Sequence, residues 1–217
     1  MISVHTYFNI IFFILLILVF GSLIKNFINN TIVNPPLIAT KLNLRTGDNK
    51  SVGSFITNNI NRSKRYSYSM NLMLRGVTNE PIKEIFHHQG QGGKGKSFTL
   101  KYNSVKSQLI IDTSNEKIEL PVEQGKWFHL LISIDLKTID VFTDGKLVST
   151  KELTELPTTP GGDIILNCRK CSKDGNSGPY VMINKLMVFG NETTDEDANA
   201  IFKAGSYDGD NFMYWNI

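Results

Sequence analysis

The sequence has little cysteine and little net charge. Two cysteines in 217 residues allow at most one disulfide, which excludes a small scaffold held together by several bridges. The formal net charge is +3, with both signs interspersed, so the chain shows no basic face of the kind that binds nucleic acid. This length is sufficient for one sizeable domain plus an appendage.

The sequence also lacks the complete patterns of several cofactor sites. The glycine-rich residues 90–96, GQGGKGK, precede an expected strand, whereas a phosphate-binding P-loop leads into a helix. His87 and His88 lie on opposite faces of an expected strand and cannot bind one metal together. Cys168 and Cys171 have the spacing of half a zinc site, but no second cysteine pair completes it. They are candidates for a local disulfide in an oxidising compartment, and for free thiols otherwise.

The longest apolar run lies near the N-terminus. Residues 8–24 carry no charge and extend roughly 26 Å as a helix, close to the ~30 Å hydrocarbon core of a bilayer. A cleaved signal peptide would add a positive segment before the run and an Ala-x-Ala-like site after it, and neither is present. We therefore expect a transmembrane anchor at residues 1–27, in contact with the membrane through residues 4–27, and a linker at residues 28–36.

The topology of this single-pass membrane protein stays open. Lys25, directly after the apolar run, favours a cytosolic location for the rest of the chain. Sequons at Asn29, Asn61 and Asn191 are candidate glycosylation sites and favour the opposite side, although an asparagine-rich chain produces such triplets by chance. The expected location is a viral or cellular membrane.

From residue 37 onward the pattern is typical of antiparallel sheet. The run from Trp127 alternates and places Phe128, Leu130, Ile132, Ile134 and Leu136 on one dry face, while the opposite face is mixed and partly wet. A shorter run ends at Asp144 and Gly145, which tolerate the positive φ of a type I′ turn and so predict a hairpin. Further strands are expected at residues 38–45, 51–60, 66–75, 82–88, 97–102, 108–112, 117–122, 163–168 and 180–189, with a loop at 153–162.

Residues 193–205, TTDEDANAIFKAG, predict a single short helix. Thr193 or Thr194 can cap its start, with Glu196 or Asp197 three residues on as the reciprocal partner. Many short strands separated by turns, followed by one helix, predict an all-β fold at residues 37–217. We expect an antiparallel two-sheet jelly-roll sandwich.

Two of these stretches resemble a known family. Trp127-x-His129 opening a long apolar strand, followed by Asp144-Gly145-Lys146, resembles the laminin-G-like branch of the concanavalin A-like lectin/glucanase superfamily. Residues 193–205 are similar to the short helix that closes many such domains. The resemblance covers residues 37–217, and its motifs are structural rather than catalytic, so it implies a fold more firmly than a function.

The resemblance raises two expectations about sites. Some relatives are glucanases, which need paired carboxylates across the sugar. Glu116 with Glu119, and Asp135 with Asp140, lack the required spacing on one strand, so a glycoside hydrolase is the least favoured function. Many relatives hold one calcium ion at the rim of the sandwich. The oxygen-bearing candidates here, among which the sequence does not choose, are Asp163, Asn167, Asp174 and Asn176.

We therefore expect a non-enzymatic, membrane-anchored protein whose lectin-like domain binds a glycan or a protein. Aromatic rings on an exposed sheet face would favour a glycan, and the candidates, for which a place in the core is equally open, are Tyr66, Tyr68, Tyr102 and Trp127. The alternative is a structural or minor capsid-associated component of a virus particle. An anchor joined to one such domain resembles proteins of large DNA viruses, and the partners would then be neighbouring capsid or envelope proteins.

Overall fold

The chain divides into two compact units, residues 1–35 and 36–217. The structure is a computed structural model, and it describes residues 13–22, 37–39, 42–43, 50–52, 64–76, 82–90, 92, 95–113, 116–166 and 180–206.

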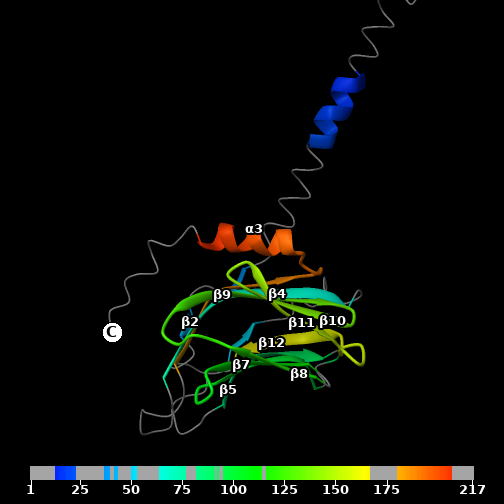
Figure 1. Ribbon diagram of the computed structural model, residues 1–217. Helices are drawn as coiled ribbons and strands as arrows, with labels where there is room; N and C mark the ends of the chain where they lie inside the picture. Colours follow the sequence, from blue (N-terminus) through cyan, green and yellow to red (C-terminus); the bar gives the residue numbers. More distant parts are fainter. Residues whose placement is uncertain are drawn as a thin grey trace, which may run out of the picture. The chain divides into compact units, whose positions relative to one another are not determined.

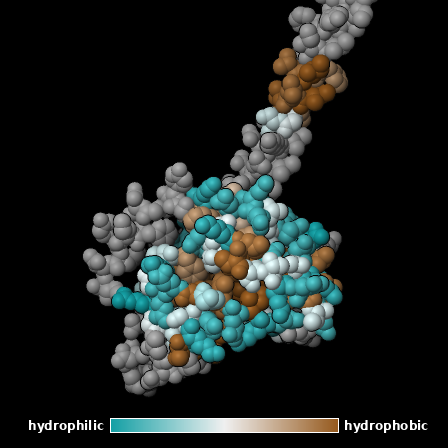
Figure 2. Space-filling view, viewed as in Figure 1, coloured by the Kyte–Doolittle hydropathy of each residue, from teal (hydrophilic) through white to brown (hydrophobic). Residues whose placement is uncertain are grey.

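In the first unit, residues 13–22 form a helix whose apolar side chains are exposed, with Phe13 at 67% and Phe20 at 59%. Figure 2 shows most of this helix in the brown of apolar residues. Within the described ranges, no helix combines the length and the hydropathy needed to cross a membrane.

The second unit is a sandwich of two antiparallel sheets (Figure 1). Sheet A contains, in spatial order, β1 (Leu37–Ala39), β13 (Tyr180–Phe189), β4 (Arg65–Arg75), β9 (Trp127–Asp135), β10 (Thr138–Thr143) and β11 (Lys146–Glu152), and β2 (Leu42–Asn43) also pairs with β13. Sheet B contains β3 (Lys50–Val52), β12 (Pro160–Leu166), β5 (Ile82–Gly90), β6 (Lys96–Asn103), β7 (Gln108–Thr113) and β8 (Lys117–Pro121). The predicted two-sheet, all-β fold with one helix after the last strand is confirmed.

The core fills the space between the sheets because alternate side chains of each strand point inward. Sheet A contributes Tyr66, Tyr68, Met70, Leu72, Leu130, Ile132 and Ile134, and sheet B contributes Phe86, Phe98, Leu100, Tyr102, Leu109 and Ile111, all fully buried. Three of the four aromatic candidates for glycan stacking, Tyr66, Tyr68 and Tyr102, therefore belong to the core. The fourth, Trp127, is half-buried at the start of β9.

The face of β9 that the alternation predicts to be partly wet is largely dry. His129, Leu131 and Ser133 are buried on it, although they point away from sheet B. The cause is α3 (Asp195–Ser206), which packs Ala198 and Ile201 against Leu131 and Phe142 of sheet A. In Figure 1, α3 lies beside β4 and β9 on the side of sheet A opposite sheet B.

The start of α3 is fixed by Thr194. Its hydroxyl accepts from the Asp197 N–H at 3.3 Å, and its own N–H donates to Asp197 Oδ2 at 3.4 Å, which forms the reciprocal cap. The hydroxyl also donates to Asp197 Oδ2 at 2.8 Å. Thr193 instead turns inward, where its N–H donates to Ser133 Oγ at 2.7 Å and its hydroxyl donates to Ser67 Oγ at 2.8 Å. Thr194 thus caps the helix, and Thr193 attaches its start to sheet A.

Some strand boundaries differ from the sequence prediction. Leu136 occupies a turn at φ 54° and is 40% exposed, so it does not continue the dry face of β9. Strand β12 begins at Pro160, inside the stretch predicted as a loop, and Pro160 pairs with Gly90. Gly162 allows this close pairing, because a Cβ there would lie 2.5 Å from the Cβ of Gln89. The predicted strand at 38–45 contains two short strands, β1 and β2.

Candidate functional site

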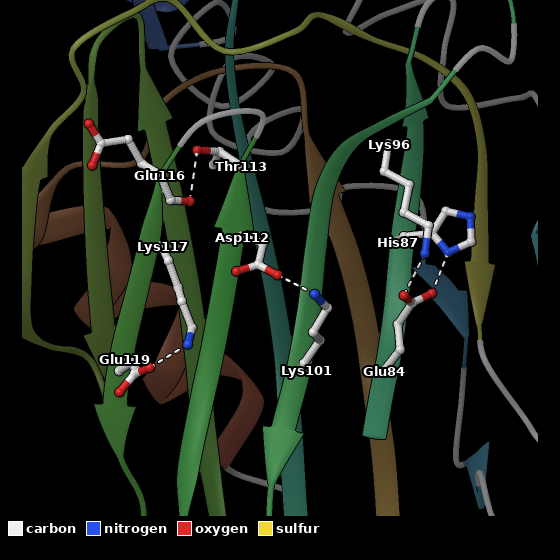
Figure 3. Close-up of polar contacts among 9 residues, drawn as sticks. All are labelled: Glu84, His87, Lys96, Lys101, Asp112, Thr113, Glu116, Lys117 and Glu119. Carbon is white, nitrogen blue, oxygen red and sulfur yellow. Dashed lines mark hydrogen bonds and ion pairs between the residues drawn. The ribbon is translucent and has the colours of Figure 1, made fainter. Parts of the chain in front are cut away.

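The outer face of sheet B carries opposite charges on four neighbouring strands. We call this set the charged face; its residues are Glu84 and His87 on β5, Lys96 and Lys101 on β6, Asp112 on β7, and Lys117 and Glu119 on β8. Figure 3 shows their carboxylates and amines directed toward one another along and across the strands. Alternation along β6, β7 and β8 turns Lys101, Asp112, Lys117 and Glu119 outward. Glu84 and Lys96 reach the same face because the pairing of β5 with β6 shifts register between Glu84 and Phe86 and between His88 and Gln89.

Glu84 occupies the most enclosed part of the charged face. Its Oε2 accepts from Lys96 Nζ at 2.5 Å, and its Oε1 lies 2.7 Å from His87 Nδ1. Burial raises the pKa of Glu84, but the hydrogen bonds from Lys96 and His87 outweigh it and leave that pKa below its usual value. Glu84 is therefore an ionised, well-bonded carboxylate near neutral pH, which makes it unsuited to donating a proton.

The remaining pairs lie between β6 and β8. Lys101 on β6 pairs with Asp112 on β7, and Lys117 pairs with Glu119 two residues along β8. Exposure of the acidic side chains rises across the sheet, from 15% for Glu84 through 27% for Asp112 to 36% for Glu119. The charged face is consequently enclosed at β5 and open toward the edge strand β8.

Sequence reasoning missed the charged face as a unit. Polar residues recur at every second position in residues 97–101 and 117–119, a pattern that is typical of one solvated strand face. Which charges become neighbours depends on the register, in which Lys101 pairs with Ile110 and Asp112 with Thr99. The alternation was available in the sequence, but the register was not.

A second polar cluster lies beneath α3 and has some features of a nucleophilic site. Ser69 Oγ is 2.8 Å from His129 Nε2, and Asp144 is hydrogen-bonded to the His129 backbone. Burial lowers the pKa of His129 to about 4, although the Asp144 carboxylate acts in the opposite direction. Ser69 is fully buried and the ring of Phe202 lies 5.8 Å from that of His129. A substrate therefore cannot reach this serine in the described structure.

The four acids considered for glycoside hydrolysis each have a separate partner. Glu116 Oε2 pairs with Lys151 at 3.2 Å, and Glu119 pairs with Lys117. Asp135 pairs with Arg65 at 2.9 Å, and Asp140 accepts from the Thr150 hydroxyl at 2.6 Å. Each of these four carboxylates is thus held by its own partner, and none of these contacts joins the two acids of a candidate pair.

The predicted hairpin turn lies between β10 and β11. Asp144 and Gly145 have φ values of 50° and 74°, the sign that a type I′ turn requires. Asp144 also ties the turn to β9, because its Oδ1 accepts from the His129 N–H at 2.9 Å and its N–H donates to the His129 carbonyl at 2.9 Å. Trp127 stands at the start of β9 opposite Met73.

The predicted metal, disulfide and glycosylation sites fall mainly outside the described residues. Of the calcium candidates, Asp163 lies on β12, and its N–H donates to Gln89 Oε1 at 3.2 Å. Candidates outside the described residues are Asn29, Asn61, Asn167, Cys168, Cys171, Asp174 and Asn176. In the described ranges no group of three or more His, Cys, Asp or Glu side chains is placed to hold a metal ion. Asn191 is described, and it is exposed. Calcium, the disulfide and the sequons stay predictions.

The two adjacent histidines point to opposite faces of β5, as the alternation predicts. His87 belongs to the charged face, whereas His88 is fully buried between the sheets. The glycine-rich residues between β5 and β6 connect two strands of sheet B, and the Gly90 N–H donates to the Gly95 carbonyl at 3.2 Å. This setting is that of a hairpin loop and differs from the strand-to-helix setting of a P-loop.

The sandwich agrees with a comparison against protein families. Residues 46–199 match a laminin-G-like family model of the concanavalin A-like lectin/glucanase superfamily. The chain belongs to this superfamily. A comparison with curated proteins gave no match. Membership in this superfamily accounts for the two-sheet architecture, but a shared fold does not identify the ligand.

Solved structures that are similar to this chain include binding domains of botulinum neurotoxins. The serotype D/C binding domain is 21% identical, with a TM-score of 0.57 over 76% of this chain and 43% of that chain. The serotype G binding domain is 15% identical, with a TM-score of 0.59 over 76% of this chain and 43% of that chain. This chain thus spans less than half the length of these structures, and the likeness is one of fold.

Proposed function

We propose that this protein is a non-catalytic binding protein that recognises a glycan or a protein through the charged face of sheet B. The observation that carries the proposal is the set of opposite charges held across β5, β6, β7 and β8 with part of each side chain still exposed. A lectin-like sandwich provides the rigid support, since these side chains project from paired strands.

The charged face suits a polar ligand. Its lysine amines donate, its carboxylates accept, and the ion pairs hold both in place before the ligand arrives, which lowers the entropic cost of binding. Its defining residues include no Phe, Tyr or Trp, and the buried tyrosines of the core are not available for ring stacking. Recognition would therefore rest on hydrogen bonds and charge, which give specificity.

The printed titles of similar structures support this ligand class. One describes botulinum neurotoxin type C as dependent on two ganglioside molecules for cell entry, and another describes a type DC binding domain in complex with rat synaptotagmin II. Those ligands belong to chains more than twice as long as the matched region and under 25% identical to it. For this chain they favour the broad class, a glycan or protein ligand.

A membrane tether completes the proposal. The uncharged residues 8–24 are long enough, when extended to 4–27, to reach across a bilayer, and the apolar side chains of the described helix at 13–22 are exposed. We propose that the chain is a single-pass membrane protein whose binding domain comprises residues 37–217. Extraction of the full chain with detergent, but not with carbonate at high pH, would test the tether.

A second candidate function is assembly into a virus particle or membrane complex. It is favoured by the exposed apolar side chains of the edge strand β11, Leu147 at 45% and Val148 at 46%. The partners would be capsid or envelope proteins, or further copies of this chain. A particle role predicts that the full chain co-purifies with particle components from its source.

The test of binding uses the full chain in detergent micelles on a glycan array and against candidate protein receptors. The double variant Lys101→Ala/Asp112→Ala removes both members of one pair, so no charge is left unpaired on the face. We expect it to weaken binding about tenfold or more, while the unfolding midpoint changes little. Measurements with calcium and then with a chelator show whether the predicted rim ion contributes.

The matched control is Glu123→Ala/Lys126→Ala, which removes an ion pair of 2.6 Å in the turn between β8 and β9, with side chains that are 68% and 69% exposed. It is expected to bind as the unchanged chain does. Equal binding by both double variants would show that the ligand contacts another surface. No binding to any glycan or receptor by a folded chain would move the proposal to the assembly role.

A further inference from the structure

His87 on β5 gives the charged face an open hydrogen-bond acceptor. Its Nδ1 lies 2.7 Å from Glu84 Oε1, and because the ionised carboxylate only accepts, Nδ1 carries the proton. In the neutral imidazole Nε2 is then an acceptor, and it has no partner within the described part of the chain. Figure 3 shows this nitrogen turned away from Glu84. Glu84 therefore fixes the tautomer of His87 and leaves one acceptor open to a ligand.

The lysines of the charged face keep hydrogen-bond donors open on the same surface. Each ammonium group has three N–H donors and directs one at a carboxylate, in the pairs Lys96–Glu84, Lys101–Asp112 and Lys117–Glu119. Lys96 and Lys117 are 49% and 51% exposed, so a ligand can reach their remaining donors. Donors and acceptors thus lie close together along β5 to β8.

The fixed charges of the charged face cancel, because its three lysines are matched by three carboxylates. An anionic group such as a carboxylate or sulfate only accepts hydrogen bonds. It meets other acceptors here, and it reaches a lysine fully only by displacing the acid that already holds it. A hydroxyl both donates and accepts, so two adjacent hydroxyls can bind a carboxylate and its lysine together without separating the pair.

We infer that the ligand of the charged face is a neutral glycan, bound through adjacent hydroxyl groups, and that the carboxylates exclude acidic glycans. The inference rests on the proposed function and names the ligand class for the same site. A protein fits this surface less well, because the centre of a protein interface is depleted of charged residues and enriched in aromatic ones. The defining residues of the charged face are acids, lysines and one histidine.

Ion pairs that are merely solvated are the competing interpretation. Such pairs are common on exposed strand faces and contribute little to stability. The part of the charged face on β5 differs from them, because Glu84 and His87 are each only 15% exposed and are bonded to one another. Lys96 holds the second oxygen of Glu84 at 2.5 Å. These side chains are ordered before a ligand arrives, which lowers the entropic cost of binding it.

The test presents the full chain in detergent micelles with matched glycans on an array, each neutral glycan beside its sialylated or sulfated form. We expect the unchanged chain to bind the neutral member about tenfold or more tightly than the acidic one. This binding should change little between low and high salt, since it gains no net charge attraction. Binding of an anion by the lysines would weaken instead, because salt screens exposed charges.

Asp112→Asn tests whether the carboxylates set the preference. It keeps the shape of the side chain, removes its negative charge and frees Lys101 for an anion. We expect it to raise the affinity for the acidic glycan about tenfold, the size of one charge-assisted hydrogen bond. The control, Glu123→Gln, makes the same change of net charge in the turn between β8 and β9 and should leave the preference unchanged. Both variants are first shown to melt cooperatively.

The outcomes separate this inference from the proposed function. A preference for acidic glycans, binding that is lost in high salt, or a protein as the sole ligand would each overturn the inference while the binding function stands. Equal responses of Asp112→Asn and Glu123→Gln would also overturn it, since the carboxylates of the charged face would not set the preference. A folded chain that binds neither glycans nor proteins would contradict the proposed function as well.

Discussion

The hydroxyl of Tyr68 on β4 and Nδ1 of His88 on β5 are 2.7 Å apart, so one hydrogen bond crosses the core from sheet A to sheet B. The other ring nitrogen, Nε2, lies 3.2 Å from the Gly162 carbonyl, which can only accept. Nε2 therefore carries the proton, Nδ1 accepts, and the Tyr68 hydroxyl donates. A neutral histidine is thus held by three strands, β4, β5 and β12.

This arrangement predicts a loss of stability in acid. Burial lowers the pKa of His88 from 6.5 to about 4, against the Gly162 hydrogen bond and the Asp163 carboxylate, which raise it. The unfolded chain then binds the extra proton first. The contribution of His88 to the free energy of unfolding is therefore fully present above pH 6.5 and is lost as the pH falls toward 4. The pKa difference corresponds to a loss on the order of 3 kcal/mol. Urea unfolding across this range measures the slope.

His88→Asn provides the comparison for the acid effect. Without the titratable ring, the dependence of unfolding free energy on pH between 6.5 and 4 should be clearly shallower. It should not vanish, because burial also lowers the pKa of His129 to about 4. An unchanged slope in His88→Asn would show that other groups cause the acid sensitivity.

The cross-core hydrogen bond itself is tested by two tyrosines on the same face of β4. Tyr68→Phe leaves His88 Nδ1 buried without a donor and should cost about 1–3 kcal/mol. Tyr66→Phe removes a buried hydroxyl that has no partner in the structure, so it should be neutral or stabilising. Chemical denaturation measures both. Equal destabilisation by the two changes would contradict the predicted role of the Tyr68 hydroxyl.

The contact between the β10–β11 turn and α3 depends on Gly145. It has φ 74°, and a Cβ there would meet Asn199 Cα and Phe202 Cβ at 3.1 Å. Gly76 has φ 85° with open space around it. Gly76→Ala should therefore cost about 1 kcal/mol from backbone strain alone, and Gly145→Ala about 2 kcal/mol or more. Urea unfolding measures both losses of unfolding free energy. If the two variants lost similar amounts, α3 would be able to move away from the new Cβ at little cost.

The cap of α3 is expected to be worth a measurable amount. Thr194→Ala removes the hydroxyl that bonds both the side chain and the N–H of Asp197, and it should destabilise the domain by about 0.5–2 kcal/mol. Thr194→Ser keeps the hydroxyl and should restore most of this loss. Thermal unfolding followed by circular dichroism measures the difference. If serine and alanine behaved alike at this position, the reciprocal cap would be unimportant.

Much of the fold could be predicted because the rules involved are local. Alternation located β4 and β9, Asp144-Gly145 located the hairpin, and the threonines before Asp197 located the start of α3. The sequence could not choose between Thr193 and Thr194 as the cap. That choice follows from Ser67 and Ser133, which are distant in the chain and hold Thr193 against sheet A.

The sequence by itself determined the strands, the turn and the helix, since each depends on neighbours a few residues apart. Only the tertiary structure decided how their surfaces are used. The register between β6 and β7 joins Lys101 to Asp112, and the packing of α3 buries His129 and closes the cluster beneath it. The edge position of β11 likewise follows from strand order. These features depend on contacts between residues far apart in sequence, and no local pattern specifies which partner each surface meets.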